Sequence, residues 1–535
     1  MKICILTAGK GSRMQPIQKN INKALLPIGG KPIISHIIEF FSLEDEFIIG
    51  LGHLGRQVKD FLSTTYPERI FHFVDIDNFD GSGSGPGHSL LYCKKILQEP
   101  FYYLPCDMSF DMNLKNVPNG NWVGTKAIDA QDSEKYCNLL VKDGKVVQIK
   151  DKQHCSSEYV AFTGLLHIED YEQFWESLEN DTTLTNGERQ ISGGLQGLLD
   201  TKGLSGMGMN WTDLGDIHNY QNAKENEYDY NFEKTDEFIF FTNKKVIKFF
   251  VDKQNVDNRV KRSRLKQNVF PVVHHDNEQF FSYPFFDGET VYSCLTPELF
   301  KTLLTWLKDN LWEKKNIDDK IMMKLCQEFY REKTLNRIKA FQDSNPNYNY
   351  PKKVNGVKVV SIPNLIEKIN WEILYEGIPS FIHGDLNFGN IIYNKELGKF
   401  ILVDWREDFA GEIEFGDLYY DIAKLYAGIL LNYDYIKKGL FKVAQEADEL
   451  NIDFKVIDNS SKYVEILEGF IESNGMQKKK VLLLVGLMIA DQAVSQYWSL
   501  FGALVLSIFY IYSHKSFLLQ RLYLIARFVG VGRRA

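Results

Sequence analysis

Hydrophobic positions in the first part of the chain fall into short apolar runs, separated by longer stretches with helical spacing. Four of the runs have the length of buried strands: KICILTA (2–8), EFIIGLG (46–52), FHFVDI (71–76) and FYYLPCDM (101–108). Three intervening stretches have helical spacing: PIISHIIEFF (32–41), GRQVKDFLSTTY (55–66) and SLLYCKKIL (89–97). Strands that alternate with helices in this way predict an α/β domain with a mixed, mostly parallel sheet.

The pattern changes near residue 220, where the stretch 220–238 is polar and rich in acidic residues. Two strand-like runs follow, EFIFFTN and KVIKFFV, and the chain is mostly helical from residue 297 onward. We therefore predict a second domain of α+β class with two lobes. The expected boundaries are a first domain at 1–228, a linker at 229–240 and a second domain at 241–535, with a small lobe at about 236–290 and a helical large lobe at about 291–535.

Composition limits the classes of partner. The chain has 535 residues with 44% hydrophobic and 25% charged residues, which is typical of folded globular domains. The net charge of −8 makes a nucleic-acid backbone an unfavourable partner. Seven scattered cysteines without a C-x-x-C pair argue against a disulfide framework and against a zinc site. Free thiols fit a reducing compartment, so we expect a cytoplasmic protein.

One apolar segment tests this expectation. The 15 residues WSLFGALVLSIFYIY (498–512) are almost entirely apolar. As a helix they would reach about 22 Å, which is short of a hydrocarbon core of roughly 30 Å. We therefore expect a buried helix and no stable membrane span, with contact to a membrane surface as the alternative. The N-terminus does not resemble a signal peptide, because a glycine-rich loop interrupts its apolar run.

That glycine-rich loop is the first candidate for phosphate chemistry. Gly9 and Gly11 would let backbone N–H groups close around phosphates, and Arg13 would add a bidentate cation. By itself this spacing also occurs in plain strand–helix connections. Lys23, in the segment NKALLPIGGKP, strengthens the functional interpretation because a second cation could return to the same triphosphate.

Residues 1–228 resemble the sugar-nucleotide pyrophosphorylases and the phosphocholine cytidylyltransferases. The resemblance rests on Gly9, Gly11, Arg13 and Lys23, and it implies a Rossmann-like nucleotidyltransferase fold. It further implies two metal-binding aspartates, Asp107 in LPCDM and Asp213 in WTDLGD, a nucleobase-binding loop at 81–91 with Gly83 and Gly85, and a phosphate-contacting Lys152. Taken singly, Asp107 could cap a helix and Asp213 could lie in a turn.

The implied reaction explains these residue types. A phosphate monoester attacks the α-phosphorus of a nucleoside triphosphate, and pyrophosphate leaves. Because two anions must approach each other, the site needs Mg²⁺, carboxylates that hold it, and cations on the leaving group. Lys23 and Arg13 are the catalytic candidates for the last task.

A second candidate centre lies in the stretch FIHGDLNFGNII (381–392). Asp385 and Asn390 have the spacing of a kinase catalytic loop, and Asp404 follows a second apolar run. In such a loop the first aspartate accepts the proton of the substrate hydroxyl, while the asparagine and the second aspartate bind Mg²⁺. The alternative is a surface loop with a coincidental match, which the hairpin pattern of the following residues argues against.

Residues 235–535 resemble the aminoglycoside phosphotransferase and choline kinase superfamily, through the H-G-D loop at His383, the D-W pair at Asp404 and the segment FGDLYYDIAKLY. The resemblance implies a protein-kinase-like fold that binds ATP through His383 and Lys248. It departs at the helix that should offer a glutamate to this lysine, because VDNRVKRSRLKQ has none and only Asp257 could substitute. Asp417 and Asp421 are expected to be structural. Aromatic residues that could surround a cationic alcohol, or belong to the core, are Tyr419, Tyr420, Tyr497 and Trp498.

The two resemblances together predict a bifunctional transferase. The second domain would phosphorylate a choline-like or other small alcohol with ATP, and the first would couple the ester to CTP or another NTP, both with Mg²⁺. The product would be an activated group for a surface glycan or lipid. One alternative is a sugar kinase joined to a sugar-1-phosphate nucleotidyltransferase that uses GTP or UTP. Another is a nucleotidyltransferase with a non-catalytic, nucleotide-sensing module. The sequence leaves the oligomeric state open.

Overall fold

The computed structural model describes residues 1–495 except 15–18, 114–115, 226–235, 276, 349, 359, 433–434, 436–439 and 447. The apolar segment at 498–512 and most of the expected linker lie outside these residues. Contacts within the chain define two compact units. The first comprises residues 1–256 and 274–285, and the second comprises residues 257–273 and the chain from 286 onward.

A nine-stranded sheet forms the centre of the first unit, in the order β5-β4-β1-β6-β11-β8-β14-β10-β9. Its strands are β1 (Lys2–Leu6), β4 (Glu46–Leu51), β5 (Ile70–Asp75), β6 (Phe101–Pro105), β8 (Trp122–Ala127), β9 (Cys137–Lys142), β10 (Lys145–Asp151), β11 (Tyr159–Ile168) and β14 (Ser205–Gly208). β5, β4, β1 and β6 are mutually parallel, whereas β11 runs antiparallel to β6 and β8. The sheet is mixed, as expected, but its later part uses antiparallel pairs such as the β9–β10 hairpin.

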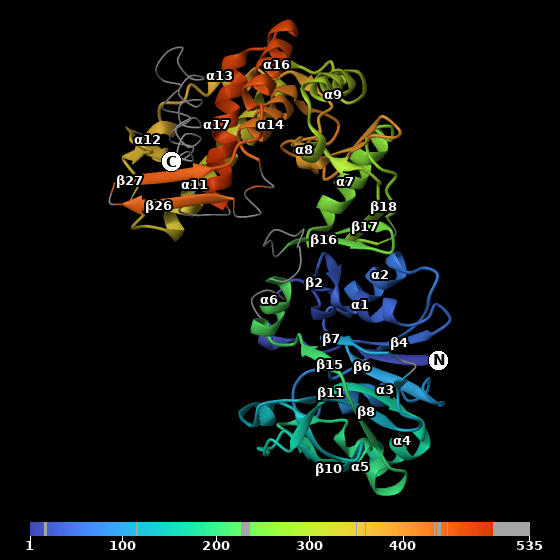
Figure 1. The fold of residues 1–535 in the computed structure, drawn as a ribbon. Helices are drawn as coiled ribbons and strands as arrows, with labels where there is room; N and C mark the ends of the chain where they lie inside the picture. The colour runs from blue at the N-terminus through green and yellow to red at the C-terminus, as the bar shows by residue number, and fades with distance from the viewer. Residues whose placement is uncertain are drawn as a thin grey trace. The chain divides into compact units, whose positions relative to one another are not determined.

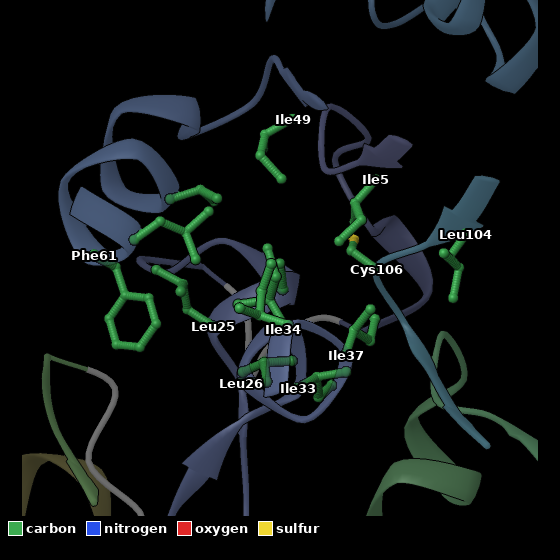
Figure 2. Packing of buried hydrophobic residues seen from close by; sticks show 14 of the residues in the cluster. Ile5, Leu25, Leu26, Ile33, Ile34, Ile37, Ile49, Phe61, Leu104 and Cys106 are labelled. Atoms are coloured by element: carbon green, nitrogen blue, oxygen red, sulfur yellow. The ribbon is translucent and has the colours of Figure 1, made fainter. Parts of the chain in front are cut away.

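Helices cover both faces of this sheet (Figure 1). They are α1 (Ile33–Phe40) and α2 (Gly55–Thr65) on one face, and α3 (Pro86–Cys93), α4 (Tyr171–Asn180) and α5 (Ser192–Thr201) on the other. In β1, Ile3 and Ile5 enter the core on the α1 face, while Cys4 and Leu6 enter the opposite core. Figure 2 shows Ile5 and Leu104 of the strands facing Ile34 and other α1 residues. Burial on both faces explains why these strands are apolar at successive positions.

Short helices and strands complete the first unit. They are η1 (Ser12–Met14), η2 (Lys23–Leu25), β2 (Pro27–Ile28), β3 (Lys31–Pro32), β7 (Met108–Asp111), η4 (Ala130–Lys135), β12 (Leu184–Thr185), β13 (Glu188–Arg189), β15 (Asn210–Asp213) and α6 (Ile217–Glu225). The ribbon formed by β7 and β15 is the part that bears on function, because it follows the end of β6.

A three-stranded antiparallel sheet, β16 (Glu237–Thr242), β17 (Lys245–Phe250) and β18 (Phe280–Pro284), also belongs to the first unit. We expected β16 and β17 to open the second domain and the stretch 279–290, which contains β18, to be a hinge between its lobes, yet all three strands share a hydrophobic core with α1 and α2. The rings of Phe61 and Phe240 meet edge to face with centroids 5.6 Å apart. The hydroxyls of Tyr66 and Thr242 are hydrogen-bonded at 2.9 Å. The small sheet is therefore joined to the first domain by both apolar and polar contacts.

The second unit is largely helical. Its helices are α7 (Lys253–Leu265), which starts in the first unit, α8 (Val291–Cys294), α9 (Pro297–Asn310), α10 (Asp319–Cys326), η5 (Gln327–Glu332), α11 (Lys333–Ser344), α12 (Ile362–Ile366), α13 (Glu372–Tyr375), η6 (Phe388–Asn390), α14 (Leu418–Leu430), α16 (Ser460–Ser473) and α17 (Lys478–Ser495). α14 is buried from its first residue to Ile429, and it packs against α16 and α17 (Figure 1). Among the described helices, none combines the length and apolar character that crossing a bilayer requires.

Strands in the second unit form small sheets. They are β19 (Glu289–Thr290), β23 (Ile391–Asn394) and β24 (Lys399–Leu402) in one sheet, β22 (Pro379–Ser380) and β25 (Gly416–Asp417) in a second, and β20 (Lys353–Val354), β21 (Val357–Lys358), β26 (Phe441–Glu446) and β27 (Glu449–Phe454) in a third. The hairpin β23–β24 has the position expected after the kinase-like loop. It brings the residues on either side of it, 390 and 403, together.

Candidate active sites

The first candidate site lies where β7 and β15 pair. Asp107 stands between β6 and β7, and Asp213 is the last residue of β15. The antiparallel register places Asp213 opposite Met108, and the N–H of Leu214 donates to the backbone carbonyl of Asp107 at 2.9 Å. Two aspartates that are far apart in the sequence are thus held side by side by backbone hydrogen bonds.

Gly215 marks the point on which the charged groups of this site converge. A Cβ atom at this position would lie 2.6 Å from Asp107 Oδ2, 3.1 Å from Asp213 Oδ1 and 3.3 Å from Arg13 Nη2. The Gly215 N–H also donates to Asp213 Oδ1 at 2.8 Å. The sequence pattern singled out the two aspartates and the arginine, but it missed the glycine that leaves room for them.

Lys23 completes the group. Its Nζ lies 2.8 Å from Asp107 Oδ2, and both side chains are mostly buried. Gly9 is adjacent, because a Cβ there would lie 3.8 Å from the Lys23 Nζ. Gly11 has a φ of 61°, a left-handed conformation that favours glycine, and it accepts a hydrogen bond from Met14 N–H in the turn that carries Arg13. The structure therefore brings the glycine loop, both cations and both aspartates together.

Asn22 holds the turn that carries Lys23, a role that the sequence pattern did not reveal. Its side-chain oxygen caps η2 by accepting from the N–H of Ala24 at 2.9 Å. Its side-chain nitrogen donates to the carbonyls of Thr7 and His53, at 3.0 Å and 2.6 Å. The lysine is thus fastened to the ends of β1 and β4, and only the N-K pair in the sequence hinted at this cap.

The pKa values of the two aspartates are shifted in opposite directions. Burial by itself would raise the pKa of Asp107, but the charges of Lys23 and then Arg13 bring the pKa below its usual value. Burial likewise opposes the charge of Lys23, and the attraction of Asp107 outweighs it, so the lysine pKa is raised. The pKa of Asp213 is raised by burial and by repulsion from Asp107. A further cation beside Asp213 would relieve this repulsion.

The donor set fits Mg²⁺, which the resemblance implies. Two carboxylates approach one point beside Gly215, and Mg²⁺ is commonly held by one or two carboxylates together with substrate phosphates. Within the described parts of the chain, no cluster of three or more His, Cys, Asp or Glu side chains is arranged for a metal. Asp107 and Asp213 would therefore hold the ion together with oxygen atoms of the substrates.

The remaining predicted residues of this domain meet at the hairpin β12–β13. Gly85 has a φ of 121°, and a Cβ there would lie 2.6 Å from the carbonyl of Arg189. Gly83, with a φ of 83°, also requires the left-handed conformation. Lys152 Nζ lies 3.6 Å from Glu188 Oε2. Their expected contacts to a nucleobase and to phosphate remain predictions.

The crowding at Gly215 gives a testable prediction. In the variant Gly215→Ala, the new methyl group must displace the Asp107 carboxylate, so we expect NTP-dependent pyrophosphate release to fall by roughly 10²-fold. Gly208→Ala is the matched control, because a Cβ there meets no atom within 4 Å. Equal initial rates of pyrophosphate release in the two variants would contradict the importance of this convergence point.

The second candidate site is built on the loop between His383 and Asn390. The N–H groups of His383 and Gly384 donate to Asp421 Oδ2 and Oδ1, each at 2.8 Å. Trp312 Nε1 donates to Asp421 Oδ2 at 3.0 Å. Burial raises the pKa of Asp421 to about 6, against the opposing effect of these hydrogen bonds. Asp421 thus holds the loop backbone, which agrees with a structural role.

Asp385 points its carboxylate at a lysine and an amide. Lys424 Nζ lies 2.7 Å from Asp385 Oδ1, and Asn390 Nδ2 donates to Asp385 Oδ2 at 3.2 Å. Burial would raise the pKa of Asp385, but Lys424 brings the pKa below its usual value. The sequence pattern predicted the proximity of Asp385 and Asn390 but missed Lys424. The only available signal was its place one helical turn after Asp421.

Asp404 lies next to this pair and is bound by an arginine. The N–H of Val403 donates to the carbonyl of Asn390 at 2.9 Å, which places the start of the Asp404 turn beside the loop. Asp404 has a φ of 58°, an uncommon conformation for a residue with a side chain. Arg259 of α7 contacts Asp404 Oδ1 at 3.2 Å and Glu407 Oε2 at 3.0 Å. The helix α7, which the resemblance expects to offer a glutamate to Lys248, thus supplies an arginine to Asp404.

The second centre also has donors that suit Mg²⁺, because this ion prefers oxygen ligands such as carboxylate and amide oxygens. Asn390 and Asp404 would hold the ion. Glu237 of the neighbouring strand β16 is an acidic partner of Lys248, with Lys248 Nζ 3.7 Å from Glu237 Oε1. Both residues belong to the first unit. The expected contact of Lys248 with ATP stays a prediction.

The aromatic residues considered for a cationic ligand lie near lysines of the chain itself. Tyr419 and Tyr420 are buried in α14. Lys480 Nζ lies 4.3 Å from the ring centroid of Tyr419, and Lys424 Nζ lies 5.9 Å from that of Tyr420. The chain's own cations therefore occupy places near these rings, which favours a core role for them. Tyr497 and Trp498 lie outside the described residues.

His383 should make the second unit sensitive to acid. Burial lowers its pKa from 6.5 to about 4, and its Nε2 lies 3.0 Å from the carbonyl of Val403. Between pH 6.5 and pH 4 the ring is protonated in the unfolded chain but neutral in the native protein. The free energy of unfolding therefore decreases as the pH falls through this range. We expect the stability deficit of His383→Gln to be smaller at pH 5 than at pH 7.5, by up to about 2 kcal/mol. Urea midpoints of both proteins test this, and a deficit independent of pH would contradict it.

Comparison with known proteins concerns the first unit. Residues 3–114 match the family described as "MobA-like NTP transferase domain". The chain is 28% identical over 225 residues to the bifunctional protein GlmU of Methanococcus vannielii, covering 40% of this chain and 52% of that protein. It is 43% identical over 63 residues, 11% of this chain and 25% of the relative, to a probable glucose-1-phosphate cytidylyltransferase of Bacillus subtilis.

Solved structures similar to this chain include UDP-glucose pyrophosphorylase complexed with UDP-glucose, at 20% identity and a TM-score of 0.37 over 42% of this chain and 97% of that one. Another is UDP-glucose pyrophosphorylase from Acinetobacter baumanii, at 16% identity and a TM-score of 0.35 over 42% and 91%. The chain spans about half the length of the GlmU relatives that it matches. The expected similarity of the N-terminal part to an NTP transferase domain, with nucleotidyltransferase relatives, is confirmed.

Proposed function

We propose that the first domain is a nucleotidyltransferase that joins the nucleoside monophosphate part of an NTP to a sugar 1-phosphate and releases pyrophosphate. The observation that carries this proposal is the convergence of Arg13, Asp107 and Asp213 around Gly215, with Lys23 bound to Asp107. Two cations and two carboxylates at one point suit a reaction between two phosphate anions.

The roles of these residues follow from charge. An oxygen of the sugar phosphate forms a bond to the α-phosphorus, and the bond from that phosphorus to the pyrophosphate oxygen breaks. Arg13 and Lys23 offset the charge that develops on the triphosphate, and the backbone of the loop at Gly9 and Gly11 offers N–H groups to it. Mg²⁺, when bound, would polarise the phosphate oxygens.

The choice of substrates rests on similarity. The Bacillus subtilis relative is described as acting on glucose 1-phosphate with a cytidylyl group, which favours a sugar phosphate over phosphocholine as the acceptor. This supports the sugar alternative of the sequence-based prediction. CTP is the first nucleotide to test, and GTP and UTP are the alternatives.

The experiment is a paired screen on the full-length protein with Mg²⁺, in which each of four NTPs is offered with glucose 1-phosphate or with phosphocholine. We expect pyrophosphate release with at least one NTP and the sugar phosphate. Release with phosphocholine alone would overturn the choice of sugar. A failure of all combinations would overturn the nucleotidyltransferase assignment.

A second activity is favoured by one separate observation. Asp385, Asn390 and Asp404 are brought together by the loop and by the hairpin β23–β24, the arrangement used for phosphoryl transfer from ATP. We propose that this centre phosphorylates a small hydroxyl compound, for which a sugar is the first choice because its product could serve the first domain. The hydroxyl oxygen bonds to the γ-phosphorus, ADP leaves, and Asp385 accepts the hydroxyl proton. A centre that binds ATP without transferring phosphate would instead be a sensing module.

A further inference from the structure

We propose that Lys424 is a positioning residue of the phosphotransferase centre, which holds Asp385 in place and supplies the positive charge that its loop lacks. This inference rests on the phosphotransferase activity proposed above. The residues that follow Asp385 up to Asn390 are Leu, Asn, Phe and Gly, so the loop carries no cation of its own. The charge comes instead from a helix that lies elsewhere in the sequence.

One buried turn of α14 binds both the backbone and a side chain of the loop. Asp421 accepts hydrogen bonds from the backbone N–H groups of His383 and Gly384. Lys424, three residues later and therefore on the same helix face, binds the side chain of Asp385 at 2.7 Å. The same helix thus fixes both the main chain of the loop and the direction of its carboxylate.

A second ion pair at the start of α14 shows what a purely structural pair looks like. Lys480 and Asp417 are 3.1 Å apart with exposed side-chain fractions of 1% and 0%. In the Lys424 pair the lysine side chain is 9% exposed, but that of Asp385 is 37% exposed. The Lys480 pair is closed to solvent on both sides, whereas the Asp385 carboxylate of the Lys424 pair keeps one side accessible. That geometry is expected where the carboxylate must meet a substrate.

The chemistry gives the lysine two tasks. Asp385 has two oxygens, and the bond of Lys424 to Oδ1 limits rotation of the carboxylate while the hydroxyl proton is transferred. The ammonium group also offsets the repulsion between Asp385 and the γ-phosphoryl group as the hydroxyl oxygen approaches that group during transfer. Both effects are larger in the transition state than in the complex with ATP, so they should appear in kcat more than in KM.

The test compares Lys424→Met with Lys424→Arg in the full-length protein, using ADP release from ATP and Mg²⁺ with and without added sugars. We expect Lys424→Met to lower kcat by roughly 10²-fold with KM for ATP changed less than threefold. Lys424→Arg should recover at least a tenth of the wild-type kcat. Pyrophosphate release by the first domain should equal that of the wild type in both variants.

Two controls separate positioning from structure. Lys480→Met removes the buried structural lysine and should lower the melting temperature more than Lys424→Met does. Lys462→Met removes an exposed lysine of α16 and should change neither quantity. Unchanged kcat in Lys424→Met, or a loss that arginine does not recover and that parallels a lower melting temperature, would overturn the inference. If the wild type releases no ADP under any condition, the phosphotransferase proposal fails, and with it the role of Lys424.

Discussion

Replacing Asp107 by asparagine is expected to lower the rate of NTP-dependent pyrophosphate release by about 10³-fold. The carboxylate binds Lys23 directly, it faces the same point as Arg13 and Asp213, and Mg²⁺ would need its charge. Asparagine keeps the size of the side chain, so the change is mainly one of charge. Removing a single charged contact from a preorganised site typically costs 10²–10³ in kcat, and here a metal contact is removed as well.

The informative comparison is with Asp111→Asn, a change at the far end of β7. Its side chain belongs to the same short strand but lies away from the convergence point, so near wild-type rates are expected. Phosphoryl transfer at the second centre should be unaffected in both variants. Pyrophosphate release that survives Asp107→Asn within tenfold of the wild type would place the reaction elsewhere.

Asp385→Asn is expected to abolish phosphorylation of a hydroxyl acceptor while pyrophosphate release continues. An amide cannot accept the hydroxyl proton, and general-base catalysis typically contributes 10²–10⁴-fold. The side chain keeps its volume and is partly exposed, so the fold should tolerate the change. Transfer of labelled γ-phosphate from ATP to a panel of sugars measures the effect.

The reciprocal variant completes this test. Asp107→Asn should lose pyrophosphate release and retain phosphoryl transfer, so the two variants should show opposite defects. Loss of both activities in either variant would contradict two separate centres. Wild-type ATP binding without any phosphoryl transfer would favour the nucleotide-sensing alternative.

Particular residues show how far the sequence alone could lead. The spacing of apolar residues predicted α1, α2 and the four parallel strands β1, β4, β5 and β6. Strands that are covered on both faces are apolar at successive positions, and such runs are easy to recognise in a sequence. The resemblance of residues 1–228 to the nucleotidyltransferases, and not this spacing, implied that Asp107 and Asp213 share one site. Neither could predict Gly215 or Asn22, because their roles depend on the close approach of segments that are distant in the sequence.

The domain boundary illustrates the same limit. The strands β16, β17 and β18 are short runs rich in apolar residues, and nothing in that pattern says which helices will cover them. Phe61 and Tyr66 of the α2 region supply the contacts, and they lie more than a hundred residues earlier. The sequence did not reveal the partner of Asp404 for a related reason: the resemblance implies an acidic residue in α7, whereas the contact is made by Arg259 of that helix.

Transfer of a nucleotidyl group at the site around Gly215 can be followed directly. An NTP labelled at its α-phosphate is incubated with glucose 1-phosphate, Mg²⁺ and either the wild type or Asp107→Asn. The label that appears in a nucleotide-linked sugar is then measured. We expect the wild type to move the label into a nucleotide-linked sugar, with one pyrophosphate released for each product, and the variant to form at least a hundredfold less. Label that remains in the NTP with every nucleotide tried, or that is transferred equally by both proteins, would contradict this expectation.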